Sequence, residues 1–173
     1  MVGLTIIREM GPIITALIFA GKIGSSSGVE LGSMRVTEQI DAMEVSGANP
    51  TQFLVVPRIL ACTIMVPLLT ILADVMALLG AYMVTALSGD MSFKLYYNKS
   101  LTILDYGDIM PAVIKTVLFG FAIGFVGCFK GFTANNGTAS VGLAANSAVV
   151  TSSIWIIIID VVVVQVTNSL LYS

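Results

Sequence analysis

The sequence predicts an all-α fold, a polytopic transmembrane helical bundle, from its composition and from the length of its apolar runs. The chain of 173 residues is 57% hydrophobic and only 10% charged, whereas soluble domains carry roughly a quarter charged residues. A water-soluble fold would therefore lack the charged groups that its surface needs. Four apolar runs are each long enough to cross a membrane, because about 20 helical residues span the ~30 Å hydrocarbon core.

The predicted spans make up a single transmembrane domain covering residues 1–173. The second run is longer than a bilayer needs, and Pro67 is the expected site of a kink. Residues 156–164 would suggest a strand in water, but the length of the fourth run and the need for internal backbone hydrogen bonds in lipid favour a helix. The four spans cover about residues 2–28, 57–88, 110–129 and 148–172.

A polar segment at residues 35–50 separates the first two spans and predicts a short helix at about 37–47. Thr37 is placed to cap the N-terminus of this helix, with Glu38 in its first turn. Gly47 is a natural C-terminal stop, and Pro50 prevents continuation of the helix.

The short helix is amphipathic. At about 100° per residue, its apolar side chains fall on one face, and these are Val36, Ile40 and Met43. Glu38, Asp41 and Glu44 fall broadly opposite, together with Val45. An apolar Val45 on the charged face favours a docking surface for a partner, while the alternative is a surface helix that lies on the lipid headgroups.

The basic residues predict which side of the membrane carries this helix. Four basic residues lie on the same side of the membrane as the short helix, and two lie in the loop on the opposite side. The positive-inside rule therefore places the helix in the cytoplasm. The four are Lys22, Arg35, Arg58 and Lys130, and the two are Lys94 and Lys99.

Ionisable residues inside the spans are expensive to bury and are functional candidates. Arg8, Glu9, Lys115 and Asp160 lie in the outer half to the middle of three different spans. Such charges should pair or line a wet cavity. They are either a polar lining or gating network for an amphiphile's headgroup, or a structural ion-pair cluster. Asp74 stands alone on its span, and its role is left open.

Small residues at four-residue spacing predict close helix packing. One pair lies at the end of the first span, and a longer series lies on the third span. The alternative is that the same positions form an interface with lipid or with a second protomer. The residues are Gly24, Gly28, Gly120, Gly124, Gly127 and Gly131.

Several function classes have no sequence support. The chain has no His and a net charge of −2, so neither a metal cluster nor nucleic-acid binding is indicated. Cys62 and Cys128 lie in apolar runs and are read as small buried hydrophobes. There is no phosphate-binding loop and no nucleophile–base pair, which predicts a non-catalytic chain without a cofactor of its own.

Several motifs resemble the MlaE/YrbE permease family, the membrane subunits of ABC transporters that work with MCE proteins. The resemblance is continuous over roughly the first 60 residues. Family members have five spans and an amphipathic interfacial helix, and Met1 corresponds to the start of their second span. The matching motifs are residues 8–12, 20–25, 30–43, Pro50 and residues 56–58.

The resemblance implies a function and a set of partners. It implies a permease homodimer in the bacterial inner membrane, a cytoplasmic ATPase that carries ATP and Mg²⁺, and a periplasmic lipid-binding MCE protein. The expected activity is transport of phospholipids or other hydrophobic molecules between the inner membrane and the outer envelope.

The resemblance also implies roles for residues. Segment 37–47 corresponds to the family's coupling helix, which docks on the ATPase. Arg8, Glu9, Lys115 and Asp160 match charged positions near its lipid pocket. The expected docking residues are Glu38, Gln39, Asp41, Met43, Glu44 and Val45.

Two other functions stay open from the residues alone. A stand-alone secondary transporter would use Lys115 and Asp160 as a proton relay, and it would need no docking helix. A non-transporting membrane scaffold would use the same charges only for stability.

Overall fold

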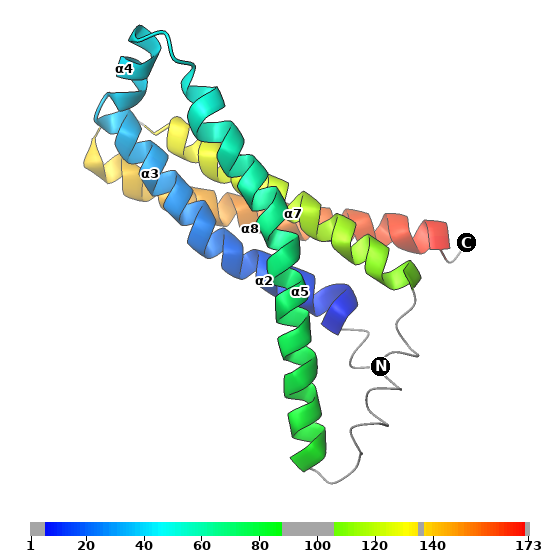
Figure 1. Ribbon diagram of the computed structural model, residues 1–173. Coiled ribbons are helices and arrows are strands. Elements are labelled where there is room, and N and C mark those ends of the chain that lie inside the picture. The colour runs from blue at the N-terminus through cyan, green and yellow to red at the C-terminus, as the bar shows by residue number, and fades with distance from the viewer. Residues whose placement is uncertain (1–5, 88–105, 135–136, 172–173) are drawn as a thin grey trace.

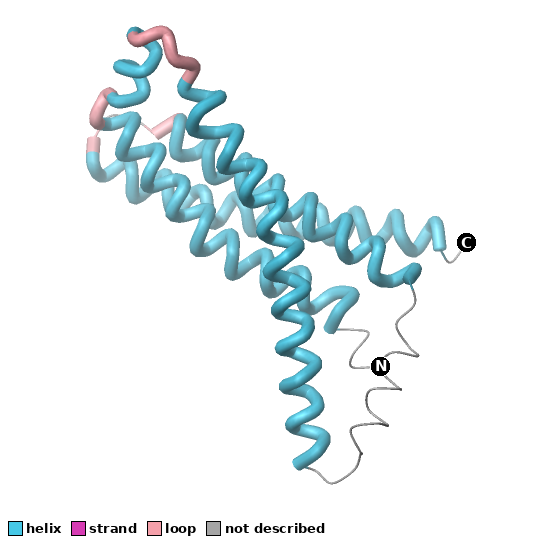
Figure 2. The backbone as a smooth tube through the Cα atoms, viewed as in Figure 1, coloured by secondary structure: helices cyan, strands magenta, loops and turns pink. Residues whose placement is uncertain are grey.

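The chain folds into an elongated bundle of helices, seen in the computed structural model, which describes residues 6–87, 106–134 and 137–171 (Figures 1 and 2). Within those ranges there is no strand, and four helical runs are long and apolar enough to cross a membrane. The predicted all-α polytopic bundle is therefore confirmed. Residues 2–5, Ser88, Tyr172 and most of the loop after the second span lie outside the described residues. The four runs are Arg8–Val36, Thr51–Val84, Met110–Phe132 and Thr138–Ser169.

The first span is one helical path with two wider π-helical turns. Pro12 has no N–H to donate to the carbonyl of Arg8, and the turn that precedes it is π-helical. The helix continues past Gly28, where the sequence predicted the span to end, and Leu31 and Gly32 beyond it are still buried in the bundle. Its parts are η1 (Ile6–Met10), α2 (Gly11–Phe19), η2 (Ala20–Gly24) and α3 (Ser25–Val36).

Helix α4 (Gln39–Val45) begins later than the sequence predicted, and the prediction that Thr37 caps it was wrong. The Thr37 hydroxyl instead donates to the carbonyl of Ser33, 2.9 Å away, at the C-terminus of α3. Glu38 occupies the N-cap position with φ 59°, in the left-handed region. This residue turns the chain sharply between the two helices, so the hydroxyl of Thr37 is used by the helix before the turn.

Helix α4 ends at Val45, and Gly47 terminates it, as the sequence predicted. Gly47 has φ +78° and donates its N–H to the carbonyl of Glu44, while Ala48 donates to Met43. Together these bonds form a Schellman motif, which satisfies carbonyls that the helix end would leave unpaired.

Helix α5 (Val56–Leu87) follows η3 (Thr51–Val55) and runs through Pro67 as one continuous helix. Its first half packs in the bundle through Cys62, Val66 and Thr70, all buried. Beyond Thr70 its described side chains are exposed or half-buried. In Figure 1 this second half diverges from the other helices and projects away from the bundle.

Helix α7 (Tyr106–Phe132) packs through its glycines against two different neighbours. A Cβ added at Gly120 would lie 2.5 Å from the carbonyl oxygen of Cys62 on α5, and Gly124 faces the same helix. Gly127 and Gly131 approach the backbone of the first span, and a Cβ added at Gly131 would lie 2.8 Å from the Cβ of Leu31. Glycines at this spacing let the helix backbones approach each other more closely than larger residues would permit.

Helix α8 (Thr138–Leu171) begins well before the predicted start of the fourth span. Residues 130–147 are rich in Gly, Ala, Asn and Ser, which predicts a flexible connection between the third and fourth spans. That prediction was wrong for residues 130–132 and 138–147, which are helical. Small residues here serve packing: a Cβ on Gly28 would lie 3.1 Å from the Cα of Ala145. The bundle centre combines these contacts with an apolar cluster of Ala16, Ala20, Val66, Phe119, Ile123 and Ile156.

Candidate functional site

Three of the charged residues predicted inside the membrane meet at one point. The Nζ atom of Lys115 on α7 lies 2.7 Å from Oδ1 of Asp160 on α8 and 2.9 Å from Oε2 of Glu9 in η1. The Lys115 side chain is 3% exposed, and that of Asp160 is 16% exposed. One buried ammonium group thus joins three of the four spans.

Arg8 extends this cluster toward the C-terminal part of α8. Its Nε atom lies 3.9 Å from Oε1 of Glu9, and its guanidinium donates to Oδ1 of Asn168 at 2.9 Å. Asn168 was not predicted, because an uncharged amide near the end of an apolar run gives no sequence signal.

The charge cluster, defined as Arg8, Glu9, Lys115 and Asp160, contains two cations and two anions and is formally neutral. Buried ions need such partners, since taking each charge out of water costs several kcal/mol. The free space against Arg8, Glu9 and Lys115 is about 10 Å³, which is at the lower limit for a single water molecule. In this conformation the cluster is closed and has no room for a lipid headgroup.

Helix α4 stands at one end of the bundle, between α3 and η3 (Figure 1). Ile40 is fully buried and anchors it, whereas Val45 on the opposite side is 90% exposed. Asp41 forms an ion pair with Arg35 of α3, which fixes the helix against its neighbour. Of the predicted docking residues, Met43 is half-buried and the others are exposed, namely Glu38, Gln39, Asp41, Glu44 and Val45.

An ion pair that the sequence did not predict joins the two spans on either side of α4. Arg58, at the start of α5, lies 2.7 Å from Oε2 of Glu30 on α3. The two residues are far apart in sequence, and only the fold brings them together. They connect the two helices to which α4 is attached.

The described part of the chain contains no arrangement of side chains suited to metal binding or thiol chemistry. Within those residues, no group of three or more acidic or Cys side chains could hold a metal ion. Cys62 and Cys128 are free and buried. Cys62 lies at the glycine-mediated contact of α5 with α7, where a Cβ on Gly124 would lie 3.2 Å from the Cβ of Cys62.

The fold and the charge cluster define an all-α, multi-pass membrane protein with a polar helix presented at one end of its bundle. The chain belongs to the MlaE permease family, because the family model described as "Permease MlaE" matches residues 1–166.

Named relatives agree with this membership. The chain is 36% identical over 165 residues to a probable ABC transporter permease protein of Rickettsia prowazekii (strain Madrid E), covering 95% of this chain and 64% of that protein. It is 34% identical over 158 residues to a probable ABC transporter permease protein of Synechocystis, with 91% and 60% covered. The chloroplastic protein Trigalactosyldiacylglycerol 1 of Arabidopsis thaliana is 34% identical over 155 residues, with 90% and 44% covered. The chain thus spans less than two thirds of the length of these relatives.

Proposed function

We propose that the chain is a membrane subunit of an ABC transporter that moves phospholipids or other hydrophobic molecules between the bacterial inner membrane and the outer envelope. ATP binding and hydrolysis take place in a cytoplasmic partner ATPase, and a periplasmic MCE protein exchanges lipid with a homodimer of this subunit. Family membership and the names of the relatives support the coarse class. The name of the Arabidopsis relative, which is that of a glycolipid, favours lipid as the substrate class.

The observation that carries the proposal is the form of α4. An isolated seven-residue helix is too short to be stable in water, yet this one is held by a buried Ile40, an ion pair to α3 and a Schellman end. Val45 is exposed on a face with no described neighbour. A rigid helix with an exposed apolar side chain suits a partner that pushes on it.

Motion of α4 would reach the charge cluster through rigid contacts. The Glu30–Arg58 pair links α3 to the start of α5. Helix α3 in turn packs on α7 and α8 through Gly131 and Gly28. Because α7 and α8 carry Lys115 and Asp160, tilting the first span changes the separation of the cluster's cations and anions. The cluster then opens for a lipid headgroup only in the driven conformation.

The decisive experiment measures association with the ATPase. The double variant Glu44→Lys, Val45→Asp changes only exposed side chains and leaves both Ile40 and the Arg35–Asp41 pair intact. We expect it to lose co-purification with the ATPase while the subunit still inserts and folds. The matched control is Glu44→Asp, Val45→Ile, which keeps the negative charge and the apolar side chain at the same two positions and should retain the ATPase. Undiminished association of the α4 variant would refute the docking role.

The same geometry also accommodates a secondary transporter, because Lys115 touches carboxylates on two other helices. Transport in vesicles separates the two functions. A proton-coupled carrier is stopped by an uncoupler and ignores the ATPase, whereas the proposed subunit requires ATP and tolerates the uncoupler.

A further inference from the structure

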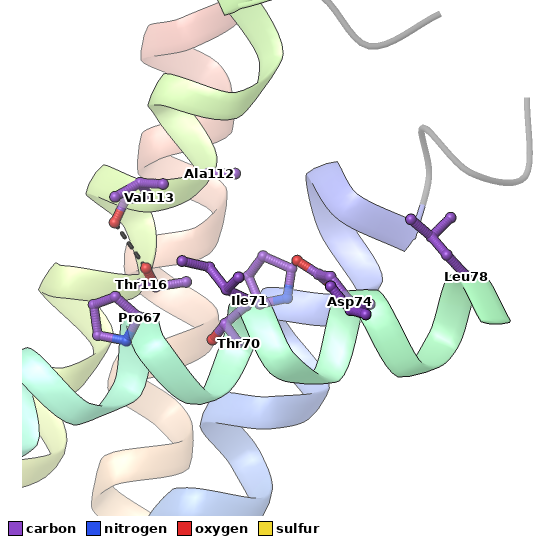
Figure 3. Close-up of a pocket in the computed structure, with 10 residues that line it drawn as sticks. Pro67, Thr70, Ile71, Asp74, Leu78, Ala112, Val113 and Thr116 are labelled. Carbon is purple, nitrogen blue, oxygen red and sulfur yellow. Dashed lines mark hydrogen bonds between the residues drawn. The ribbon is translucent and has the colours of Figure 1, made fainter. Parts of the chain in front are cut away.

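A cavity of about 220 Å³ lies where the projecting half of α5 leaves the bundle. Figure 3 shows its α5 side, with Thr70, Ile71 and Asp74, and its α7 side, with Ala112 and Thr116. Pro12 of α2 closes the cavity on a third side. The cavity is separate from the charge cluster, although Ala112 contributes to the walls of both.

Asp74 is the one ionisable residue among those that line the cavity, and its Oδ1 atom is buried without a hydrogen-bond partner among the described residues. Buried polar atoms are nearly always paired, since an unpaired one loses its bonds to water without replacement. An unpaired carboxylate oxygen within the membrane-spanning part is therefore a strong indication of a missing partner.

The chemistry of the walls restricts what that partner can be. The hydroxyl of Thr70 already donates to the carbonyl of Val66, and that of Thr116 donates to Val113, each at 2.8 Å. The two prolines, Pro12 and Pro67, have no N–H. The lining thus offers acceptors, and its two hydroxyl donors are both in use. A phosphate or carboxylate guest would find no donor and would meet a like charge, while a plain alkane would leave Asp74 unpaired.

We propose that this cavity binds the head of an amphiphile that donates hydrogen bonds, either a hydroxyl or an ammonium group, with Asp74 as the acceptor. The alkyl part lies against Ile71, Val75 and Val113, and it continues into the lipid along the projecting half of α5. This site is independent of the proposed transport function, because binding to it requires neither ATP nor a partner chain.

Photoaffinity labelling of the purified chain in detergent tests the site. Three diazirine probes share one alkyl chain and differ in the head: dodecanol, dodecylamine and dodecyl phosphate. We expect the alcohol or the amine to label residues 71–78 and 112–116 roughly tenfold more than the phosphate does, as a hydrogen bond to a charged acceptor would give. Equal labelling by all three probes, or labelling confined to other segments, would overturn the proposal.

Variants of Asp74 connect the labelling to this side chain. Asp74→Leu should reduce labelling by the alcohol and the amine to the level of the phosphate, and it should not lower the unfolding temperature, because it removes an unpaired buried carboxylate. Asp74→Asn keeps an acceptor oxygen without the charge, so retained alcohol labelling with lost amine labelling identifies a hydroxyl bound by hydrogen bonding alone. Loss of both in Asp74→Asn shows that either head requires the negative charge, and the probe that labels the unaltered chain more strongly then identifies the head.

The control is Glu44→Leu, an acidic-to-Leu change on α4 outside the cavity, which should leave labelling unchanged. Labelling that survives in Asp74→Leu would refute the assignment of the acceptor. Failure here would leave association with the ATPase intact, so it is distinguishable from failure of the proposed function.

Discussion

The Nζ atom of Lys115 lies 2.7 Å from Oδ1 of Asp160, so α7 and α8 are joined by an ion pair whose cation is almost entirely buried. Glu9 adds a third helix to the same ammonium group at 2.9 Å. The position of Lys115 between two carboxylates makes it the residue on which the cluster's charge balance depends.

Replacing Lys115 by Met should destabilise the bundle strongly. The change leaves the partly buried carboxylates of Glu9 and Asp160 without the buried cation that they share, and removing one partner of a buried ion pair typically costs about 3–5 kcal/mol. Unfolding in mixed detergent micelles, followed by the fluorescence of Trp155, the single tryptophan of the chain, measures the loss. The matched control is Lys22→Met, which removes an exposed lysine. The triple variant Glu9→Gln, Lys115→Met, Asp160→Asn should recover most of the stability, and failure to recover would contradict an electrostatic cause.

Replacing Gly120 by Ala should weaken the contact of α7 with α5. The new Cβ would lie 2.5 Å from the carbonyl oxygen of Cys62, so the two backbones must separate, and overpacking of this kind costs about 1–3 kcal/mol. The control is Gly80→Ala on α5, whose added Cβ meets nothing within 4 Å. It should stabilise by up to ~1 kcal/mol through helix propensity. Equal unfolding free energies for the two variants would contradict the close approach.

Replacing Glu38 by Gly should be tolerated, whereas Glu38→Val should loosen α4. With φ 59° the backbone is left-handed, which costs an L-residue roughly 1–2 kcal/mol and a β-branched one more. Hydrogen exchange of the α4 amides is the measurement, with Gln39→Val as the control at a position of ordinary helical geometry. Faster exchange in the Gly variant than in the Val variant would argue against the observed turn.

The Glu30–Arg58 pair should contribute little to global stability. Glu30 has a side chain 62% exposed to its surroundings, and exposed pairs typically contribute about 0–1 kcal/mol. A double-mutant cycle with Glu30→Gln and Arg58→Gln isolates the interaction from other effects of each change. A coupling free energy above ~2 kcal/mol would place the pair among fully buried ones.

Composition and span length were sufficient to predict the fold class, whereas the depth of the charged residues in the membrane stays a prediction. Which charges pair could not be predicted, because pairing depends on how each helix is rotated about its axis. Arg8 and Glu9 are adjacent and point about 100° apart, and only the packing of α7 decides that Glu9 faces Lys115. The prolines that frame the Asp74 cavity, Pro12 and Pro67, lie on different spans, and no sequence pattern relates them.

The start of α8 shows why composition misleads in membranes. Residues 138–147 are rich in Gly, Ala, Asn and Ser, which are typical of loops in soluble proteins. In a membrane bundle the same small residues permit close approach of helices, and Ala145 is used in this way against Gly28. A similar ambiguity applied to Thr37, whose hydroxyl could serve the helix on either side.

The two-sided glycine face of α7 has a consequence for how the protein is assembled. Helices insert into a membrane individually and associate afterwards, and α3 and α5 are synthesised before α7. Gly120 and Gly124 then receive α5, while Gly127 and Gly131 receive α3. Until α7 arrives, neither earlier helix has these contacts. Insertion of the third span therefore completes the packing of both earlier helices, and a defect in its glycine face would leave α3 and α5 without these contacts even if each helix had inserted correctly.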